Sequence, residues 1–224
     1  ALRSVVNAVQ VSPDGKHVLV HKIESREGDY LLEIYKTDDL RKPIRRLNAN
    51  PMEIINAQWV SNNFIFGTAW QVKRSQVKRP EADIRDYLGY SYSLSENKFR
   101  TLDGTFSLFN TLPKDPDNIL VSDANSIPDP TGVDPFEAFR PRAYYKFNLK
   151  RATRSLVLKG NRKFPRVDLF DNEGNPRYTS NLDANDGLLK TYYRKPGEGS
   201  WTPLQEIDVE DTGNLYKVLA GFHG

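Results

Sequence analysis

The sequence predicts an all-β fold of the β-propeller type, and the first observation behind this prediction is a recurring unit. In its clearest copy, residues 9–20, a strand-like run enters a Ser-Pro-Asp-Gly turn and an alternating run leaves it. Weaker copies follow at steps of 49, 52 and 58 residues, counted between the equivalent apolar positions Val11, Val60, Leu112 and Phe170. Because four-stranded propeller blades repeat at roughly 40–50 residues, we expect about four such blades in the chain.

Turn chemistry and composition are the two further observations. Pro13 presets its φ angle, Asp14 can accept hydrogen bonds from backbone N–H groups ahead of it, and Gly15 accommodates a positive φ. Hydrophobic residues make up 38% of the chain, fewer than in an average globular domain, whereas aromatic residues reach 11% and fall inside the alternating runs. This pattern is typical of thin antiparallel sheets in which half of each strand faces outward.

The first two blades are expected over residues 5–47 and 54–102. The strands expected in the first blade are residues 5–11, 17–23, 30–35 and 44–47. Those expected in the second blade are residues 55–60, 64–72, 87–94 and 98–102. The middle hairpin of the second blade carries a charged insertion, residues 73–86, in which we expect a short helix at residues 80–85.

The third and fourth blades are expected over residues 106–158 and 167–207, and an incomplete fifth over residues 214–224. The strands expected in these two blades are residues 106–111, 119–123, 143–149 and 155–158, then 167–170, 176–181, 188–194 and 201–207. Residues 124–142 hold four prolines. Because proline cannot donate to a sheet ladder, this segment is expected to form a loop across one face.

Four blades and the start of a fifth are few for a propeller, which usually closes with about four to eight. We therefore expect the chain to be a fragment of a larger propeller. The alternative is a compact four-bladed ring with a strand left over. An open blade exposes unpaired backbone groups along its edge, so self-association by strand addition is a further expectation.

Charge and composition exclude several classes of partner. The net charge is only +3, and the basic clusters lie at expected hairpin ends among acidic residues, so no nucleic-acid partner is expected. No run of residues approaches the roughly 18 apolar positions that span a membrane, so no membrane partner is expected. The absence of cysteine excludes disulfides, thiolate metal sites and cysteine nucleophiles, but it leaves the compartment open.

Six segments in order along the chain carry a resemblance to a known family. They are Val-Ser-Pro-Asp-Gly-Lys at 11–16, Leu-Leu-Glu-Ile-Tyr at 31–35, Ile-Arg-Arg-Leu at 44–47, Ile-Asn-Ala-Gln-Trp-Val at 55–60, Tyr-Tyr-Lys-Phe-Asn-Leu-Lys at 144–150 and Asp-Asn-Glu-Gly-Asn-Pro-Arg at 171–177. Together they resemble the N-terminal propeller of the prolyl oligopeptidase family of serine peptidases, in its dipeptidyl-peptidase and acylaminoacyl-peptidase branch. Similar Ser-Pro-Asp-Gly turns also occur in Tol-type periplasmic propellers.

The resemblance implies a role within a larger serine peptidase. In that family the propeller does no chemistry: it caps the active site of a C-terminal α/β-hydrolase domain and restricts access to short or unfolded peptides. The implied partners are that hydrolase domain, expected beyond Gly224, and peptide substrates. The implied source is bacterial, in the periplasm or cytoplasm, with export favoured. The chain itself is expected to be no enzyme and to hold no cofactor or metal.

The candidate catalytic residues agree with this expectation. A nucleophile elbow needs Gly-x-Ser-x-Gly between a strand and a helix, and Ser200, in Gly-Glu-Gly-Ser-Trp, lies outside such a pattern in an expected hairpin turn. His17 and His21 lie on the same face of one strand, where we expect them to face solvent. Two imidazoles without a third and fourth ligand do not make a zinc site.

Two acidic segments remain as weaker candidate sites. The first contains Asp168, Asp171, Asn172, Glu173 and Asn175. Because these residues lack the alternate spacing and closing bidentate Glu of a calcium loop, an Asx-rich turn is expected there.

The second segment is residues 81–86 of the charged insertion, whose candidate substrate-contact residues are Glu81, Asp83 and Arg85. The resemblance implies that an acidic inserted helix reaches the active-site cavity and binds the free amine of the substrate. Glu81 and Asp83 take that role if the insertion points inward, and a solvated hairpin tip is the alternative.

A stand-alone propeller that binds a protein or glycan partner is the alternative function. Its surface would comprise the loop at residues 124–142 and the aromatic residues Trp70, Tyr87, Tyr90 and Tyr92. Because these aromatic residues fall in expected strands, packing in the blade core is the competing interpretation. A hydrolase domain encoded after residue 224 favours the gating function, and a stop codon there favours the binding function.

Overall fold

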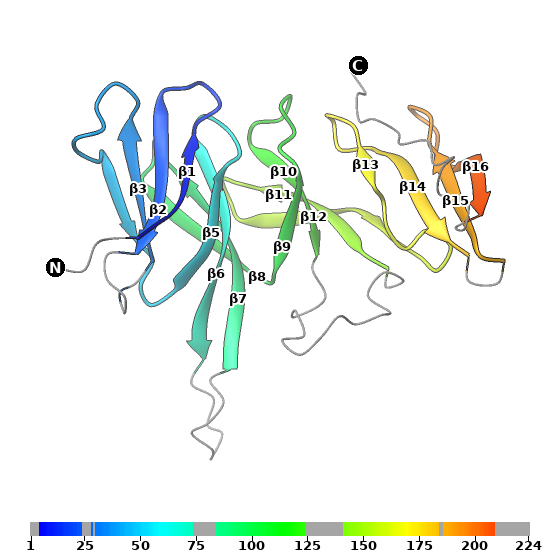
Figure 1. Cartoon of the computed structure of the whole chain (residues 1–224), viewed down its shortest axis with the longest axis horizontal. Helices are drawn as coiled ribbons and strands as arrows, with labels where there is room; N and C mark the ends of the chain where they lie inside the picture. The colour runs from blue at the N-terminus through cyan, green and yellow to red at the C-terminus, as the bar shows by residue number, and fades with distance from the viewer. Residues whose placement is uncertain are drawn as a thin grey trace, which may run out of the picture. The chain divides into compact units, whose positions relative to one another are not determined.

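The computed structural model describes residues 5–23, 28, 30–73, 84–123, 141–183 and 186–208, and over these residues the chain is all β (Figure 1). Sixteen strands form four four-stranded antiparallel sheets, and neighbouring strands in each sheet follow one another in the chain. The predicted all-β class with four four-stranded blades is confirmed. The fifth blade expected at residues 214–224 lies outside the described residues.

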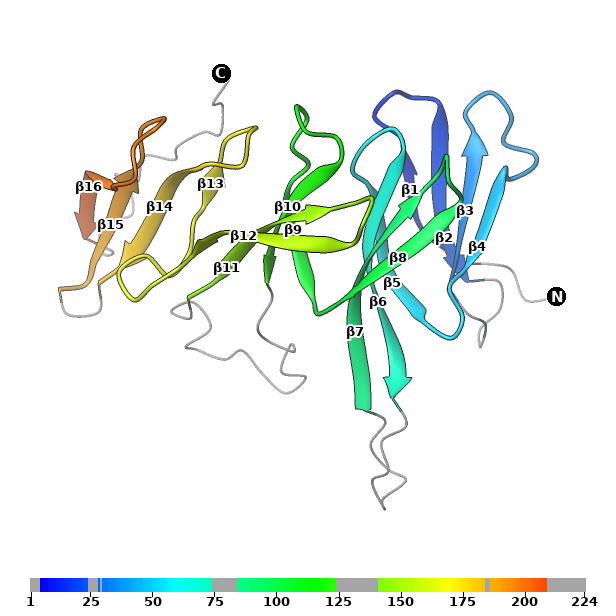
Figure 2. The same cartoon turned by 180° about the vertical axis from the view of Figure 1, so that it is seen from behind.

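Figures 1 and 2 show these sheets from opposite sides. The first sheet consists of β1 (Val5–Val11), β2 (His17–Ile23), β3 (Tyr30–Lys36) and β4 (Arg45–Asn48). The second consists of β5 (Glu53–Trp59), β6 (Phe64–Lys73), β7 (Ile84–Ser93) and β8 (Lys98–Asp103). The third consists of β9 (Phe106–Asn110), β10 (Asn118–Asp123), β11 (Ala143–Asn148) and β12 (Thr153–Lys159). The fourth consists of β13 (Leu169–Phe170), β14 (Pro176–Leu182), β15 (Leu188–Tyr193) and β16 (Thr202–Asp208).

The chain divides into two compact units, Ala1–Phe106 with Asn148–Thr153, and Ser107–Phe147 with Arg154–Gly224. In the first unit, one core joins the first two sheets. Its buried residues are Leu19, Leu32, Ile34, Leu47, Ala49, Ile54, Ala57, Trp59, Ile65, Ala69, Tyr90 and Tyr92. The second unit has a core around Leu112, Leu120, Tyr144 and Val167.

The Ser-Pro-Asp-Gly turn is a hydrogen-bonded corner of the first sheet. The buried Ser12 hydroxyl donates to Asp14 at 2.7 Å and accepts from the N–H of His17 at 2.9 Å. Gly15 has a φ of 71° and donates its N–H to the Ser12 carbonyl at 2.8 Å. The motif that carries the family resemblance therefore has a structural task, because it fixes the register of β1 against β2.

Gln10 bridges the two sheets of the first unit along their first strands. Its Nε2 donates to the carbonyl of Ala57 at 3.0 Å, and its Oε1 accepts from the N–H of Trp59 at 3.2 Å. Because both partners are backbone groups of β5, the side chain satisfies polar groups at the edge of the neighbouring sheet. β1 and β5 are thereby held side by side.

The short helix predicted at residues 80–85 is wrong over its last two residues. Ile84 and Arg85 begin β7 and pair with Lys73 and Val72 of β6. Continuation of the ladder satisfies backbone groups that a helix of six residues would leave partly unpaired. Residues 80–83 lie outside the described residues, as do residues 124–140 of the predicted loop.

The prediction that His17 and His21 face solvent is also wrong. His21 is 5% exposed and His17 is half-buried. Alternation places both on the face of β2 that carries Leu19, and this face packs into the core of the first unit. The strand period gave the shared face correctly, but it does not say which face is covered.

Candidate functional site

The β6–β7 hairpin extends beyond the other strands of its sheet. Each of its strands has ten residues, against seven in β5 and six in β8. The ladder with β5 ends at Trp70 and the ladder with β8 ends at Leu88. From there β6 and β7 continue as a two-stranded ribbon to the pair of Lys73 and Ile84, and Figures 1 and 2 show this ribbon passing the ends of β5 and β8. The charged insertion is therefore attached to the tip of a projecting arm.

Of the three predicted substrate-contact residues, the structure describes only the backbone of Arg85. Glu81 and Asp83 lie outside the described residues, so their role stays a prediction. The backbone of Arg85 lies in β7 directly opposite Val72, within the ribbon. The structure thus places one of the three on a regular strand next to the insertion.

A pair of aromatic residues lies at the base of the arm. Trp70 and Tyr87 are directly opposite each other in the β6–β7 ladder, and both are half-buried. Cross-strand aromatic pairs stabilise antiparallel sheets, so this pair favours extension of the ribbon at the point where β5 ends.

Tyr90 and Tyr92 belong to the core instead. Each is 1% exposed. The Tyr90 hydroxyl donates to the carbonyl of Asn56 at 2.8 Å, and that of Tyr92 donates to Asn97 at 2.7 Å. The blade-core interpretation is confirmed for these two residues, and they cannot form the binding surface that the alternative function requires.

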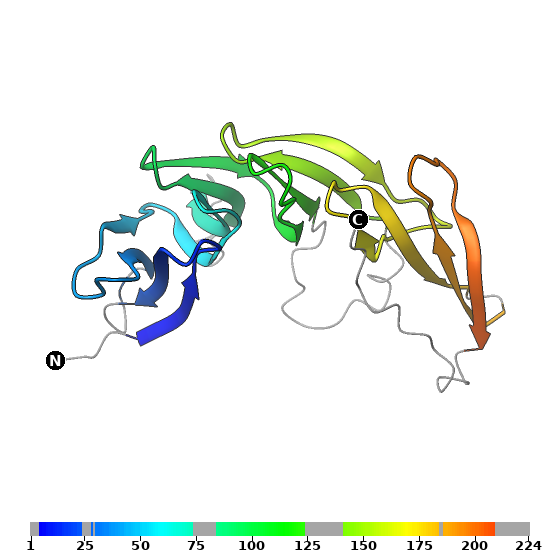
Figure 3. The ribbon, with the colours of Figure 1, turned by 90° about the horizontal axis from the view of Figure 1, so that it is seen from above.

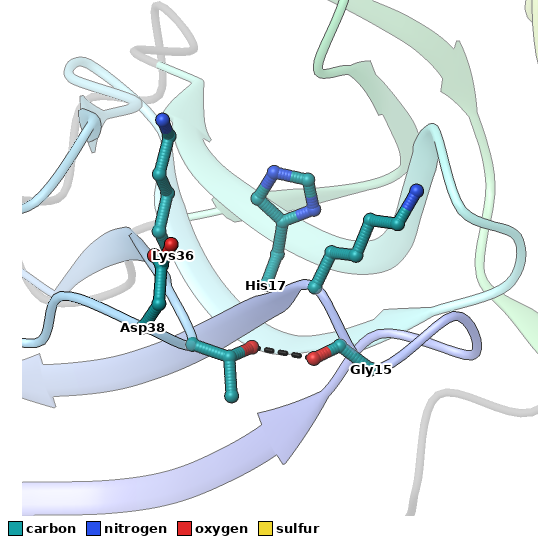
Figure 4. A pocket seen from close by; sticks show the side chains of 6 residues that line it. Gly15, His17, Lys36 and Asp38 are labelled. Atoms are coloured by element: carbon teal, nitrogen blue, oxygen red, sulfur yellow. Dashed lines mark hydrogen bonds between the residues drawn. The ribbon is translucent and has the colours of Figure 1, made fainter.

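A hollow of about 410 Å³ lies at the shared end of β2 and β3, and sequence reasoning missed it (Figure 4). It is lined by Gly15, Lys16, His17, Lys36, Thr37 and Asp38. His17 and Lys36 are opposite each other in the ladder and project from the same face. The Thr37 hydroxyl donates to the Gly15 carbonyl at 2.6 Å, which joins the two turns that form the hollow. The order of the predicted strands could have indicated this hollow, because a meander of consecutive antiparallel strands brings the turns at residues 12–16 and 36–44 to the same end of the sheet.

An adjoining hollow of about 470 Å³ shares Lys36 and makes this end of the sheet cationic. It is lined by Lys36, Asp39, Lys42, Pro43, Ile44 and Arg45. Asp39 is paired with Arg41 at 3.0 Å, whereas within the described part of the chain the exposed Lys16, Lys36 and Lys42 have no carboxylate at ion-pair distance. Exposed lysines are well hydrated and conformationally free, so this surface attracts anions without selecting one of them.

The acidic segment predicted to be an Asx-rich turn is confirmed as such. Asp171 accepts hydrogen bonds from the N–H groups of Glu173 at 3.0 Å and Asn175 at 2.8 Å, and from the Arg177 Nε at 2.8 Å. Burial alone would raise the pKa of Asp171, but the hydrogen bonds from Asn175 and Arg177 outweigh it and lower that pKa. Within the described ranges, no group of three or more acidic or histidine side chains is arranged to hold a metal ion.

No model of a known protein family matches the sequence, and no curated protein matches it. Among solved structures, an acylaminoacyl peptidase from Pyrococcus horikoshii is similar, with a TM-score of 0.48 and 11% identity, over 87% of this chain and 29% of that one.

Two further similar structures carry lactonase names. A putative 6-phosphogluconolactonase from Bacteroides fragilis has a TM-score of 0.34, and a periplasmic gluconolactonase from Pseudomonas aeruginosa has one of 0.36. Both are 12% identical to this chain, and each match covers 92% of this chain and 55% of the lactonase chain. The chain thus spans from about a third to just over half of these proteins, and similarities this low do not place it in a family.

Proposed function

We propose that this chain is a non-catalytic propeller segment of a serine peptidase of the prolyl oligopeptidase type, which gates and positions peptide substrates for an α/β-hydrolase domain. The observation that carries the proposal is the β6–β7 arm, which extends beyond its sheet and is continuous with the charged insertion that contains Glu81 and Asp83. The resemblance of the six sequence segments supports the family.

The arm suits substrate positioning because a paired ribbon is stiffer than a loop. The ladder is continuous to Lys73 and Ile84, so the backbone on both sides of the insertion is fixed. Residues held on regular elements are placed more accurately than residues on free loops. In this proposal Glu81 and Asp83 bind the amino terminus of the peptide, and Arg85 contacts its backbone or carboxylate.

The test is a loop exchange in the protein expressed from its natural gene. Residues 74–83 are replaced by Asn-Gly, because a two-residue type I′ turn closes a hairpin whose flanking residues are directly paired, as Lys73 and Ile84 are. We expect kcat/KM for peptides with a free amino terminus to fall at least about tenfold, the value of one lost charge-assisted hydrogen bond, mainly through KM. Peptides with an acetylated amino terminus should change little.

Point variants separate the acidic groups from the arm itself. Glu81→Gln and Asp83→Asn should reproduce most of the loss, and Asp38→Asn, which changes an exposed carboxylate in the turn after β3, is the matched control. Equal losses for free and acetylated peptides would contradict amine recognition. A natural gene product with the 25.6 kDa mass of this chain would contradict the hydrolase partner and favour a stand-alone binding propeller.

A further inference from the structure

The first two sheets correspond residue by residue along their first strands. β1 and β5 each have a register shift directly after their second residue, Val6 in β1 and Ile54 in β5. Beyond the shift both strands keep the same register against the following strand. The equivalent pairs are Val6 with Ile54, Val9 with Ala57, Val11 with Trp59, and Val18 with Ile65.

In the second sheet, the face formed by these positions is covered. Ile54, Ala57 and Trp59 are 1%, 7% and 8% exposed, and they share a core with Leu19 and Ile34 of the first sheet. Leu19 and Ile34 lie opposite each other in the β2–β3 ladder, on the face that alternates with Val18. The Leu19 and Ile34 face of the first sheet therefore covers the second sheet. The covered face of the second sheet is the equivalent of the opposite face of the first sheet, the one that carries Val18.

In the first sheet, the same face is open along β1, whereas Leu31 and Glu33 of β3 on this face are buried. Val6, Val9 and Val11 are 53%, 59% and 57% exposed, and Val18 is half-buried beside them. We call these four residues the valine face. β1 is the edge strand of its sheet (dark blue in Figure 3). Contiguous exposed apolar side chains of this kind mark interaction surfaces.

The polar residues on this side of the sheet already have partners. Lys22 is 2.8 Å from Glu33, and the Tyr35 hydroxyl donates to the same carboxylate at 2.6 Å. Burial alone would raise the pKa of Glu33, but the hydrogen bonds from Lys22 and Tyr35 outweigh it and lower that pKa, so the carboxylate stays charged within this network. A partner that covers the valine face thus needs to supply apolar surface rather than a counter-ion.

We propose that the valine face is a docking surface for a further four-stranded sheet of the blade type, which packs on it an aliphatic face like that of Leu19 and Ile34. The argument for this occupant is internal to the molecule, because the equivalent face of the second sheet receives such a sheet. Face-to-face packing of sheets at about 10 Å buries alternate residues of both partners, and the valines occupy alternate positions around the register shift.

A second copy of this chain fits the valine face less well. In its fourth sheet, the turn that closes from Asp171 to Asn175 corresponds to the turn from Ser12 to His17, so Arg177 stands where the first sheet has Leu19. Arg177 is engaged with Asp171, and it would place a charged group against the valines. The fourth sheet of a second copy is therefore not the expected occupant of the valine face.

The test measures thiol protection, because the chain has no cysteine of its own. Val9→Cys, Ala57→Cys and Leu40→Cys are made one at a time in the protein expressed from its natural gene. Ala57 is the covered equivalent of Val9, and Leu40, 60% exposed, is the open control. Each protein is reacted with a maleimide under native conditions, and the modified peptide is quantified by mass spectrometry.

We expect Val9→Cys to react at least about tenfold more slowly than Leu40→Cys, as Ala57→Cys does, because a covered thiol reacts only after local opening. In the isolated chain of residues 1–224, Val9→Cys should react as fast as Leu40→Cys. Equal rates for Val9→Cys and Leu40→Cys in the natural protein would overturn the proposal. Protection that appears only at concentrations where the mass doubles would overturn it too, since the occupant would then be a second copy.

Discussion

Gly67 lies in the middle of β6, where two neighbours leave no room for a side chain. A Cβ at this position would lie 2.6 Å from the Tyr90 hydroxyl and would clash with the carbonyl of Asn56. Gly67→Ala should therefore lower the free energy of unfolding by about 1–3 kcal/mol, as overpacking of a core does. Urea unfolding measures the change, and Gly199→Ala, where a Cβ meets nothing within 4 Å, is the matched control. Equal midpoints for the two variants would show that β5 and β6 separate more easily than this geometry implies.

His21 should make the stability of the first unit sensitive to mild acid. Burial lowers the pKa of His21 below its ordinary value of 6.5, against the opposing effect of a hydrogen bond with the backbone of Ile54. A histidine with a depressed pKa stays neutral in the folded state while the unfolded chain takes up a proton. The unfolded state then binds more protons, so stability is full above pH 6.5 and falls as the pH drops through the interval down to the folded-state pKa.

Chemical unfolding at a series of pH values checks this prediction. His21→Gln should remove the pH dependence just below 6.5, and His17→Gln should retain it. The carboxylates of Glu33 and Asp171 have lowered pKa values, so their contributions are lost at lower pH, below the ordinary values of 4.5 and 3.8. An unchanged slope in His21→Gln would assign the acid sensitivity to another group.

At the scale of elements, turn chemistry and the alternation of apolar residues predicted the strands, but they did not predict which face of each strand is buried. The Ser12 corner and the Asp171 turn could be predicted because each depends on a side chain bonding to backbone a few residues away. The burial of His21 and the strand conformation of Arg85 depend on partners in β5 and β6, which are distant from them in the sequence. The cationic hollow at Lys36 likewise depends on two turns that meet only through the meander. Local rules therefore predicted the elements, and tertiary contacts decided the sites.

The Asp171 turn carries a prediction at the same scale. Asp171→Ala removes the acceptor of two backbone N–H groups and the partner of Arg177, which is 8% exposed, so the free energy of unfolding should fall by about 1–3 kcal/mol. Glu173→Ala, which breaks an exposed pair with Lys114, should change it by less than about 1 kcal/mol. Added millimolar calcium should leave the melting temperature of the unmodified protein unchanged. If calcium raised the melting temperature and Asp171→Ala abolished that rise, the turn would be a metal site rather than a purely structural turn.

The described part of the chain repeats one four-stranded sheet architecture, but equivalent faces of its sheets differ in exposure. The first and second sheets share a register, yet equivalent positions are valines open to solvent in one and core residues in the other. The β6–β7 ribbon departs from this scheme by lengthening one hairpin while its sheet stays four-stranded. The proposed gating function uses both parts of this scheme, because the repeated sheets supply stability and the extended hairpin holds the candidate contact residues.

At this scale we expect the isolated chain to have no peptidase or esterase activity. Acceleration of acyl transfer needs a nucleophile, a base within hydrogen-bond reach and an oxyanion site, and Ser200 lies exposed in the connection between β15 and β16 rather than at a strand-to-helix turn. Aminoacyl p-nitroanilides and p-nitrophenyl esters are the substrates to use, with the protein expressed from its natural gene as the positive control. Ser200→Ala distinguishes a contaminant from the chain itself. Hydrolysis that both a serine-reactive inhibitor and Ser200→Ala abolish would make this chain an enzyme in its own right, and the gating function would then have to be abandoned.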